Sequence, residues 1–149
     1  MRIALGADHA GFEMKEQLRA WLVVRGHEVE DLGTHGPSSV DYPDFAGEVG
    51  RRVNRGEADL GVLVCGSGTG MAISANKVRG VRAANCWDVT AARLARAHND
   101  ANVLALGSRL VGPGLAEDIL ETFLETPFEQ GRHSRRIDKI TDLDAANAR

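Results

Sequence analysis

The sequence of 149 residues has little of several features that define whole classes of proteins. Its two cysteines, Cys65 and Cys86, are too few for the disulfide framework of a small secreted protein. No apolar run approaches the roughly 20 residues that cross a bilayer, and the first ten residues lack the apolar core of a signal peptide. With 18 basic and 21 acidic residues the net charge is −3, which argues against nucleic acid as the main ligand. We therefore expect a cytoplasmic protein that binds neither membranes nor nucleic acid.

Glycine, in contrast, is abundant, with 17 glycines against 4 prolines. The length fits one domain, and 43% hydrophobic with 26% charged residues is typical of a globular protein, so we expect residues 1–149 to form a single domain. Glycines without a collagen or linker repeat indicate turns in which the backbone closely approaches another group. Their positions therefore indicate where a ligand binds.

Short apolar runs alternate with amphipathic stretches along the chain. The runs predict five strands, at residues 2–7, 28–32, 60–64, 81–86 and 103–106. The amphipathic stretches predict helices at residues 11–25, 44–55, 71–78, 88–99, 113–124 and 131–143. We also predict that Asp44 caps the second helix and that residues 33–43 form a loop. Because the strands are mostly continuously apolar, the pattern predicts a Rossmann-like, doubly wound α/β domain, with a five-stranded parallel sheet covered by helices on both faces.

Residues 65–70 (CGSGTG) contain three glycines between a predicted strand and a predicted helix. Backbone N–H groups at a helix N-terminus can bind an anion, whereas a tight connection needs only one or two glycines. The dinucleotide fingerprint requires a further glycine where Met71 stands, although Asp88 lies at a suitable distance beyond it. A non-catalytic nucleotide-binding module therefore remains an alternative.

Cys65 ends a predicted strand directly beside this loop. A cysteine in such a place is ordinarily a small buried residue, but a helix N-terminus can also convert a thiol into a reactive thiolate. Catalysis and redox sensing are both open to such a thiol. Cys86 has no comparable neighbours, and we predict that it lies in the core.

Polar residues also follow other predicted elements. Asp8 and His9 follow the first strand, where ligands bind in doubly wound sheets. His98 and Asn99 end a helix, where a histidine can act as an acid or a base and an asparagine can cap the helix. No two histidines have the spacing of metal ligands, so the sequence predicts no metal.

Arginines provide a candidate phosphate site. Arg132 and Arg136 are four residues apart on a predicted helix and share one face of it. Together with Arg109 they could clamp a phosphate group. The alternative is a solvated basic face that pairs with Asp138 or Asp142.

Six motifs occur in an order that is typical of one known family: GADHAGF, DYP, CGSGTGM, ANK, HNDANVLALGSR and GRHxxR. In them the sequence resembles the ribose 5-phosphate isomerase type B family, which includes galactose 6-phosphate isomerase subunits. The resemblance extends from Arg2 to about Ile140. It implies a homodimer that interconverts an aldose phosphate and its ketose without metal or cofactor. It also implies that residues of both subunits complete each active site, and we expect the C-terminal helix to pack on the partner subunit.

By position, the resemblance implies that Cys65 is the catalytic base and that His98 opens the sugar ring. Part of the family has Gly at position 65 and a Glu base at position 71, so Cys65 and Met71 indicate the cysteine-base branch. The matching substrate contacts are Asp8, His9, Gly66, Ser67, Gly68, Thr69, Gly70, Asn99, Arg109, Arg132 and Arg136. The expected reaction converts ribose 5-phosphate to ribulose 5-phosphate through an enediolate. Allose, galactose or tetrose phosphates remain alternative substrates, and a tetramer remains an alternative to the dimer.

Overall fold

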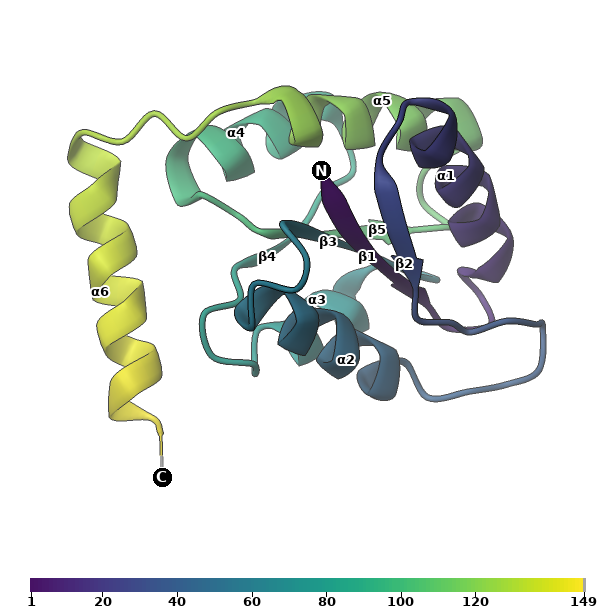
Figure 1. Ribbon diagram of the computed structural model, residues 1–149, viewed down its shortest axis with the longest axis horizontal. Helices are drawn as coiled ribbons and strands as arrows, with labels where there is room; N and C mark the ends of the chain where they lie inside the picture. Colours follow the sequence, from purple (N-terminus) through teal and green to yellow (C-terminus); the bar gives the residue numbers. More distant parts are fainter. Residues whose placement is uncertain (149) are drawn as a thin grey trace.

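A computed structural model, which describes residues 1–148, contains a parallel sheet between two layers of helices (Figure 1). The described residues form five strands, namely β1 (Arg2–Ala7), β2 (Glu28–Asp31), β3 (Leu60–Cys65), β4 (Ala83–Asn85) and β5 (Val103–Gly107). Their order in the sheet is β2-β1-β3-β5-β4, and all neighbours are parallel. The predicted doubly wound α/β architecture is confirmed.

Helices cover both faces of this sheet (Figure 1). One face carries α1 (Phe12–Val24), α4 (Val89–Asn99) and α5 (Pro113–Glu125), and the other carries α2 (Tyr42–Asn54) and α3 (Thr69–Ala75). The last helix, α6 (Arg132–Ala146), stands at the side of the molecule next to β4 and packs against α4. In α6 only His133 is buried, so most of this helix is exposed.

The alternating side chains of the strands build two separate cores. In β3, Val62 and Val64 belong to the apolar cluster under α1, α4 and α5, which also contains Phe123. Leu63 of the same strand belongs to the cluster under α2 and α3. Cys86 is buried in the first cluster, as predicted. Because helices cover both faces of the sheet, the ends of its strands are the places left for a polar site.

Two helices begin two residues before their predicted starts. Asp44 does not cap α2, because the helix begins at Tyr42 and Asp41 occupies the N-cap position. Pro43 lies in the first turn, where its fixed φ suits a helix and its missing N–H needs no partner. The next helix, α3, begins at Thr69, two residues before the predicted start. Both shifts bring helix starts closer to the carboxyl edge of the sheet.

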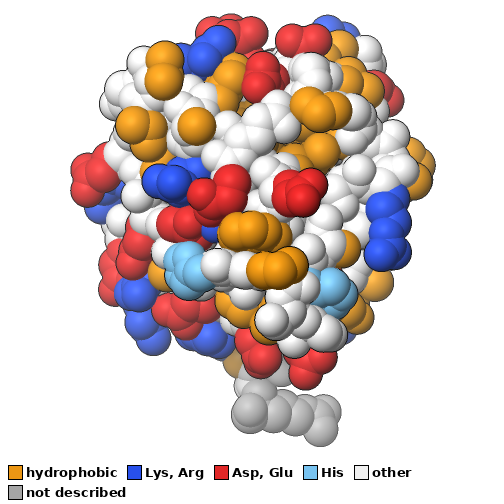
Figure 2. Space-filling view, turned by 90° about the vertical axis from the view of Figure 1, so that its right-hand side faces the viewer, with side chains coloured by type: hydrophobic (Ala, Val, Ile, Leu, Met, Phe, Trp, Pro, Cys, Tyr) orange, Lys and Arg blue, Asp and Glu red, His pale blue; other side chains and the backbone are white. Residues whose placement is uncertain are grey.

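The surface is mixed in charge. Figure 2 shows the side of the molecule that carries the loop between β2 and α2, on which acidic and basic side chains are interspersed. This arrangement agrees with the net charge of −3. No helix within residues 1–148 combines the length and apolar character that a membrane span requires.

Candidate active site

A cavity of about 440 Å³ opens at the carboxyl ends of β1, β3 and β5. This is the edge of a doubly wound sheet at which ligands bind. The predicted site residues that line it are Asp8, His9, Cys65, Gly66, Ser67, Gly70 and Arg109. Gly68 and Thr69 belong to the same loop as four of these residues. One chain thus brings together most of the predicted site.

Cys65 is the last residue of β3 and lies in the wall of this cavity. It is only 4% exposed, yet its sulfur has a polar neighbour, because the backbone N–H of Gly68 donates to Sγ over 3.1 Å. An anionic sulfur accepts such a hydrogen bond more strongly than a neutral one. Cys86, in contrast, is buried among apolar side chains, and this burial raises the pKa of its thiol to about 11. The two cysteines therefore lie in chemically different surroundings.

The glycine loop, residues 65–70, is held by contacts on both sides. Asn85, at the end of β4, donates through Nδ2 to the carbonyl oxygen of Ser67 over 3.2 Å and to Oγ1 of Thr69 over 3.3 Å. On the other side, the ring of Tyr42 lies so close to Gly70 that a Cβ there would be 2.7 Å from the ring carbons. The loop is therefore fixed from β4 and from α2.

Asp8 and His9 are anchored at the end of β1. Asp8 is buried, and its Oδ1 accepts a hydrogen bond from the backbone N–H of Gly11 over 3.0 Å. His9 is exposed, and its Nδ1 accepts from the backbone N–H of Val40 over 3.2 Å. The other ring nitrogen, Nε2, lies on the far side of the imidazole from this contact. Both side chains are thus positioned by backbone groups at the mouth of the cavity.

Arg109 brings a positive charge to the same cavity. Its backbone N–H donates to the carbonyl oxygen of Gly66 over 3.0 Å. Its guanidinium lies over the same glycine, since a Cβ on Gly66 would be 3.2 Å from Nη1. A guanidinium beside a glycine-rich loop is a suitable pair of donors for an anionic ligand.

Four predicted site residues lie away from the cavity: His98 and Asn99 at the end of α4, and Arg132 and Arg136 on α6. The reason is topological. Helix α4 leads into β5 at the start of that strand, whereas Cys65 lies beside Gly107 at its end. A strand of five residues spans about 16 Å. Within one chain, these four residues and Cys65 therefore lie at opposite ends of the strands.

The nucleotide-binding alternative does not fit this topology. A dinucleotide fingerprint joins two neighbouring strands, and its acidic residue follows the second of them. Here β5 lies between β3 and β4. The carboxylate of Asp88 accepts a hydrogen bond from the backbone N–H of Ala91 and so caps α4. Asp88 is a helix cap in this structure.

A family model described as Ribose/Galactose Isomerase matches residues 3–140 of this chain. The chain belongs to the ribose/galactose isomerase family. The ribose-5-phosphate isomerase B of Escherichia coli (strain K12) is 47% identical over 143 residues, which cover 96% of each protein. A solved ribose-5-phosphate isomerase B from Clostridium thermocellum is 49% identical, has a TM-score of 0.98, and covers 99% of this chain and 100% of its own. A third, from Mycoplasma genitalium with bound ribulose 5-phosphate, has a TM-score of 0.93 at 42% identity, over 97% of this chain and 96% of that one.

This protein is therefore an aldose–ketose isomerase. Three further residues line the cavity that the sequence did not indicate as site residues, namely Ala10, Tyr42 and Leu110. Tyr42 could have been found, because it lies in the DYP motif. Asn85 was also missed, because the strand end AAN carries no signal that its side chain turns toward a loop 16 residues earlier.

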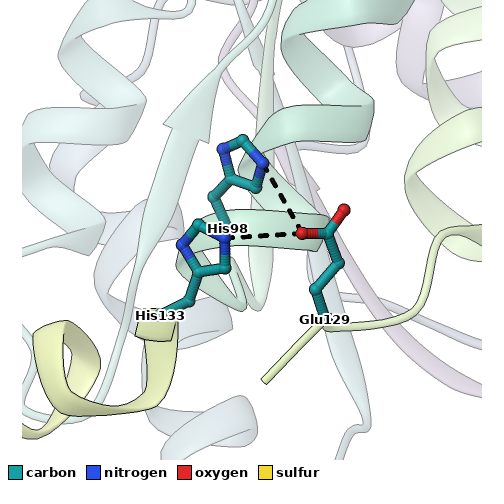
Figure 3. A group of neighbouring side chains, drawn as sticks. All are labelled: His98, Glu129 and His133. Atoms are coloured by element: carbon teal, nitrogen blue, oxygen red, sulfur yellow. Dashed lines mark ion pairs between the residues drawn. The ribbon is translucent and has the colours of Figure 1, made fainter. Parts of the chain in front are cut away.

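The isomerase has a second polar cluster at the opposite edge of its sheet, around His98 (Figure 3). The rings of His98 and His133 are stacked, with centroids 4.3 Å apart and an angle of 12° between the planes. Oε2 of Glu129 lies 3.8 Å from Nε2 of His98 and 3.4 Å from Nε2 of His133. Burial, the neighbouring His98 and the charge of Arg132 lower the pKa of His133. Neither Glu129 nor His133 was predicted, because both lie far from His98 in the sequence.

Proposed function

We propose that this isomerase interconverts ribose 5-phosphate and ribulose 5-phosphate through an enediolate, with the thiolate of Cys65 as the base. The observation that carries the proposal is the position of Sγ, in the wall of the cavity and 3.1 Å from the N–H of Gly68. The names of the Escherichia coli and Clostridium thermocellum relatives support this substrate. The ribulose 5-phosphate bound to the Mycoplasma genitalium relative supports it as well.

The reaction moves one proton between two neighbouring carbons. In the open-chain aldose, Cys65 takes the proton from C2 and the carbonyl electrons move to O1, which gives the enediolate. The same sulfur returns the proton to C1, the hydroxyl proton on O2 passes to O1, and O2 becomes the ketone oxygen, so the number of protons is unchanged. Backbone N–H groups of the glycine loop stabilise the negative oxygen, and one good donor of this kind contributes about 3–4 kcal/mol. Arg109 binds the phosphate and holds C1 and C2 near the sulfur.

We further propose that the working enzyme is a homodimer with shared active sites. A ring-opening acid–base group is needed near the sugar, and His98 is the family's residue for this step, but it lies at the opposite edge of the sheet from Cys65 in the same chain. A second copy would supply His98 and Asn99 from α4. It would also supply Arg132 and Arg136 from the exposed α6. Because its substrate is a phosphorylated metabolite, we place the enzyme in the cytoplasm.

The role of Cys65 is tested by Cys65→Ala with Cys86→Ala as the matched control. Loss of the base is expected to lower kcat by about 1000-fold or more, while the Kd for ribose 5-phosphate changes little. Cys86 lies in the core away from the cavity, so its variant should keep near-normal kcat. A Cys65→Ala protein with substantial turnover would refute the thiolate mechanism.

The shared site is tested by mixing two inactive variants, Cys65→Ala and His98→Asn. In a twofold dimer, each mixed pair contains one site with both substitutions and one intact site. Equal mixing after partial denaturation and refolding should therefore restore about one quarter of the wild-type activity. A site completed within one chain gives no recovery, and that result would exclude the dimer proposal.

A second candidate function is isomerisation of a six-carbon aldose phosphate, because the family description names galactose beside ribose. Values of kcat/KM for ribose 5-phosphate against galactose 6-phosphate, allose 6-phosphate and a tetrose 4-phosphate decide between the candidates. The same panel is measured with and without a chelator. A kcat/KM at least tenfold higher for a six-carbon substrate would replace the pentose assignment.

A further inference from the structure

Three side chains from separate segments converge beside the end of α4 (Figure 3). His98 comes from α4, Glu129 from the connection between α5 and α6, and His133 from the first turn of α6. One nitrogen of each histidine and one oxygen of the glutamate all lie within 4.8 Å of one another. Two imidazoles and a carboxylate form a donor set that several catalytic zinc sites use.

The separations are those of loose ion pairs and are close to the spacing of two ligands on one cation. Oε2 of Glu129 lies 3.4 and 3.8 Å from the two imidazole Nε2 atoms, beyond the 2.7–3.2 Å usual for a hydrogen bond. Over residues 1–148, no hydrogen bond joins these three side chains to one another. Tetrahedral Zn²⁺, with Zn–N and Zn–O near 2.0–2.2 Å, places neighbouring ligand atoms about 3.3–3.5 Å apart. The 3.4 Å separation falls within this range and the 3.8 Å separation is slightly longer.

The backbone fixes the positions from which the three donors reach this point. The N–H of Glu129 donates to the carbonyl oxygen of Ala97, the neighbour of His98, over 3.0 Å. His133 lies four residues after Glu129, in the first turn of α6, and is buried, with its side chain 7% exposed. In the single chain the side chains of His98 and Glu129 are 37% and 57% exposed, so a cation can reach the cluster from solvent. The stacked rings cannot both aim lone pairs at one point, so binding requires the more exposed His98 ring to turn.

We propose that His98, Glu129 and His133 form a binding site for a divalent first-row transition metal, with Zn²⁺ the best match, and that occupation of this site inhibits the isomerase. Imidazole donors favour Zn²⁺, Co²⁺ and Ni²⁺ over Mg²⁺ and Ca²⁺, which prefer oxygen. The inhibition rests on the proposed role of His98, since a metal on its ring nitrogen removes the group that opens the sugar ring. The binding itself does not depend on that role.

Binding is measured in the full-length Cys65→Ser protein, so that the thiol of the cavity cannot supply a competing ligand. Titration with Co²⁺ is expected to give the visible absorption bands of a four- or five-coordinate site at one equivalent, and Zn²⁺ should displace them. Glu129→Gln and His133→Gln should each weaken binding at least tenfold. His35→Gln is the matched control, because His35 also lies 4.0 Å from a carboxylate but in a different part of the surface. Absence of the bands, or equal binding by His133→Gln, would overturn the proposed site.

Inhibition is measured separately on the enzyme with Cys65 intact. Zn²⁺ should reduce its activity, EDTA should restore it, and Glu129→Gln should need at least ten times more Zn²⁺ for the same fractional loss. Equal sensitivity of Glu129→Gln would mean that the cavity thiol binds the inhibitor, which overturns the inhibitory role. If Co²⁺ binds at the cluster but Zn²⁺ does not inhibit, the metal site stands and the assignment of ring opening to His98 fails.

Discussion

Oδ1 of Asn85 occupies the space that a side chain on Gly68 would need. A Cβ built on Gly68 would lie 2.3 Å from this oxygen, and the φ of the residue is +79°. The amide nitrogen of the same asparagine donates to the carbonyl oxygen of Ser67. The end of β4 therefore fills the place next to the glycine and also fixes the loop that carries it. The geometry around Cys65 depends on this arrangement, because the N–H that donates to its sulfur belongs to Gly68.

We predict that Gly68→Ala lowers kcat/KM by about 100-fold, because the loop must move and the N–H leaves its position beside the sulfur. Gly26→Ala is the matched control. Gly26 has a similar φ of +82°, but a Cβ there meets no atom within 4 Å. Both variants carry the cost of a left-handed alanine, about 1–2 kcal/mol. Only Gly68→Ala should lose activity.

The comparison needs urea denaturation curves and steady-state kinetics on both variants. Equal loss of activity in both would show that general destabilisation is responsible. Normal kinetics for a folded Gly68→Ala protein would remove the loop from the mechanism.

Arg109 is expected to act through the phosphate of the substrate. Arg109→Gln removes the charge but leaves a polar side chain, and a charge-assisted hydrogen bond contributes about 1.5–3 kcal/mol. We therefore predict a 10- to 100-fold loss in kcat/KM, mostly through a higher KM, with weaker competitive inhibition by inorganic phosphate. The control is Arg51→Gln, since Arg51 pairs with Glu48 on the exposed side of α2. Unchanged phosphate inhibition in Arg109→Gln would contradict the assignment.

The ammonium group of Lys15 has no exposed surface and lies 2.6 Å from Asp31 and 2.7 Å from Glu16. Lys15→Met leaves the carboxylate of Asp31, which is 18% exposed, without its nearest cation. Breaking a buried ion pair costs about 3–5 kcal/mol, and Arg19, 3.8 Å from the same oxygen, offsets part of this cost. We predict a loss of about 2–3 kcal/mol in the free energy of unfolding, measured with urea.

Two further variants test the reason for that loss. Adding Asp31→Leu to Lys15→Met removes the more buried of the two carboxylates that Lys15 contacts, so the double variant should be less destabilised than the sum of the two single variants. Asp59→Asn is the surface control, because the Arg2–Asp59 pair is largely exposed and contributes at most about 1 kcal/mol. Strict additivity would mean that Lys15 contributes through packing alone.

Burial disfavours the thiolate of Cys86, and its pKa of about 11 keeps the group protonated at pH 8. A thiol reagent at that pH should therefore modify one cysteine in the folded protein, and ribose 5-phosphate should protect it. Cys86 should react only in urea. Since the unfolded thiol ionises near pH 9, Cys86 stabilises the fold below that pH and loses this contribution as the pH rises toward 11. Rapid labelling of Cys86 in the native protein, detected by mass spectrometry, would contradict this account.

The parallel sheet was predictable because its central strands β1, β3 and β5 are short apolar runs that both layers of helices bury. The site at the end of β3 was predictable for a related reason, since Cys65 and the glycines that follow occupy a strand end where backbone groups face a ligand. Helix starts were less predictable. The sequence predicts a loop at Pro43, but this residue lies in the first turn of α2. Proline suits the first turn of a helix because its fixed φ is helical and its missing N–H needs no partner there.

Spatial relations between distant segments could not be predicted. Nothing in the sequence indicates that His133 stacks on His98, because the contact depends on how the connection after α5 returns to α4. The position of Asn85 against Gly68 depends in the same way on β5 lying between β3 and β4. Sequence patterns report local conformation and burial, whereas these contacts depend on the three-dimensional path of the chain.

The separation of Cys65 and His98 at opposite edges of one sheet affects how defects in this protein should be interpreted. If two copies share each site, an isolated chain has both of its cores but no complete set of reacting groups. Weakened pairing would then lower the specific activity on dilution, while the melting behaviour of each chain could remain ordinary. Substitutions on α6 that weaken this pairing but leave Arg132 and Arg136 unchanged would be recorded as losses of catalysis, and raising the protein concentration would reverse them.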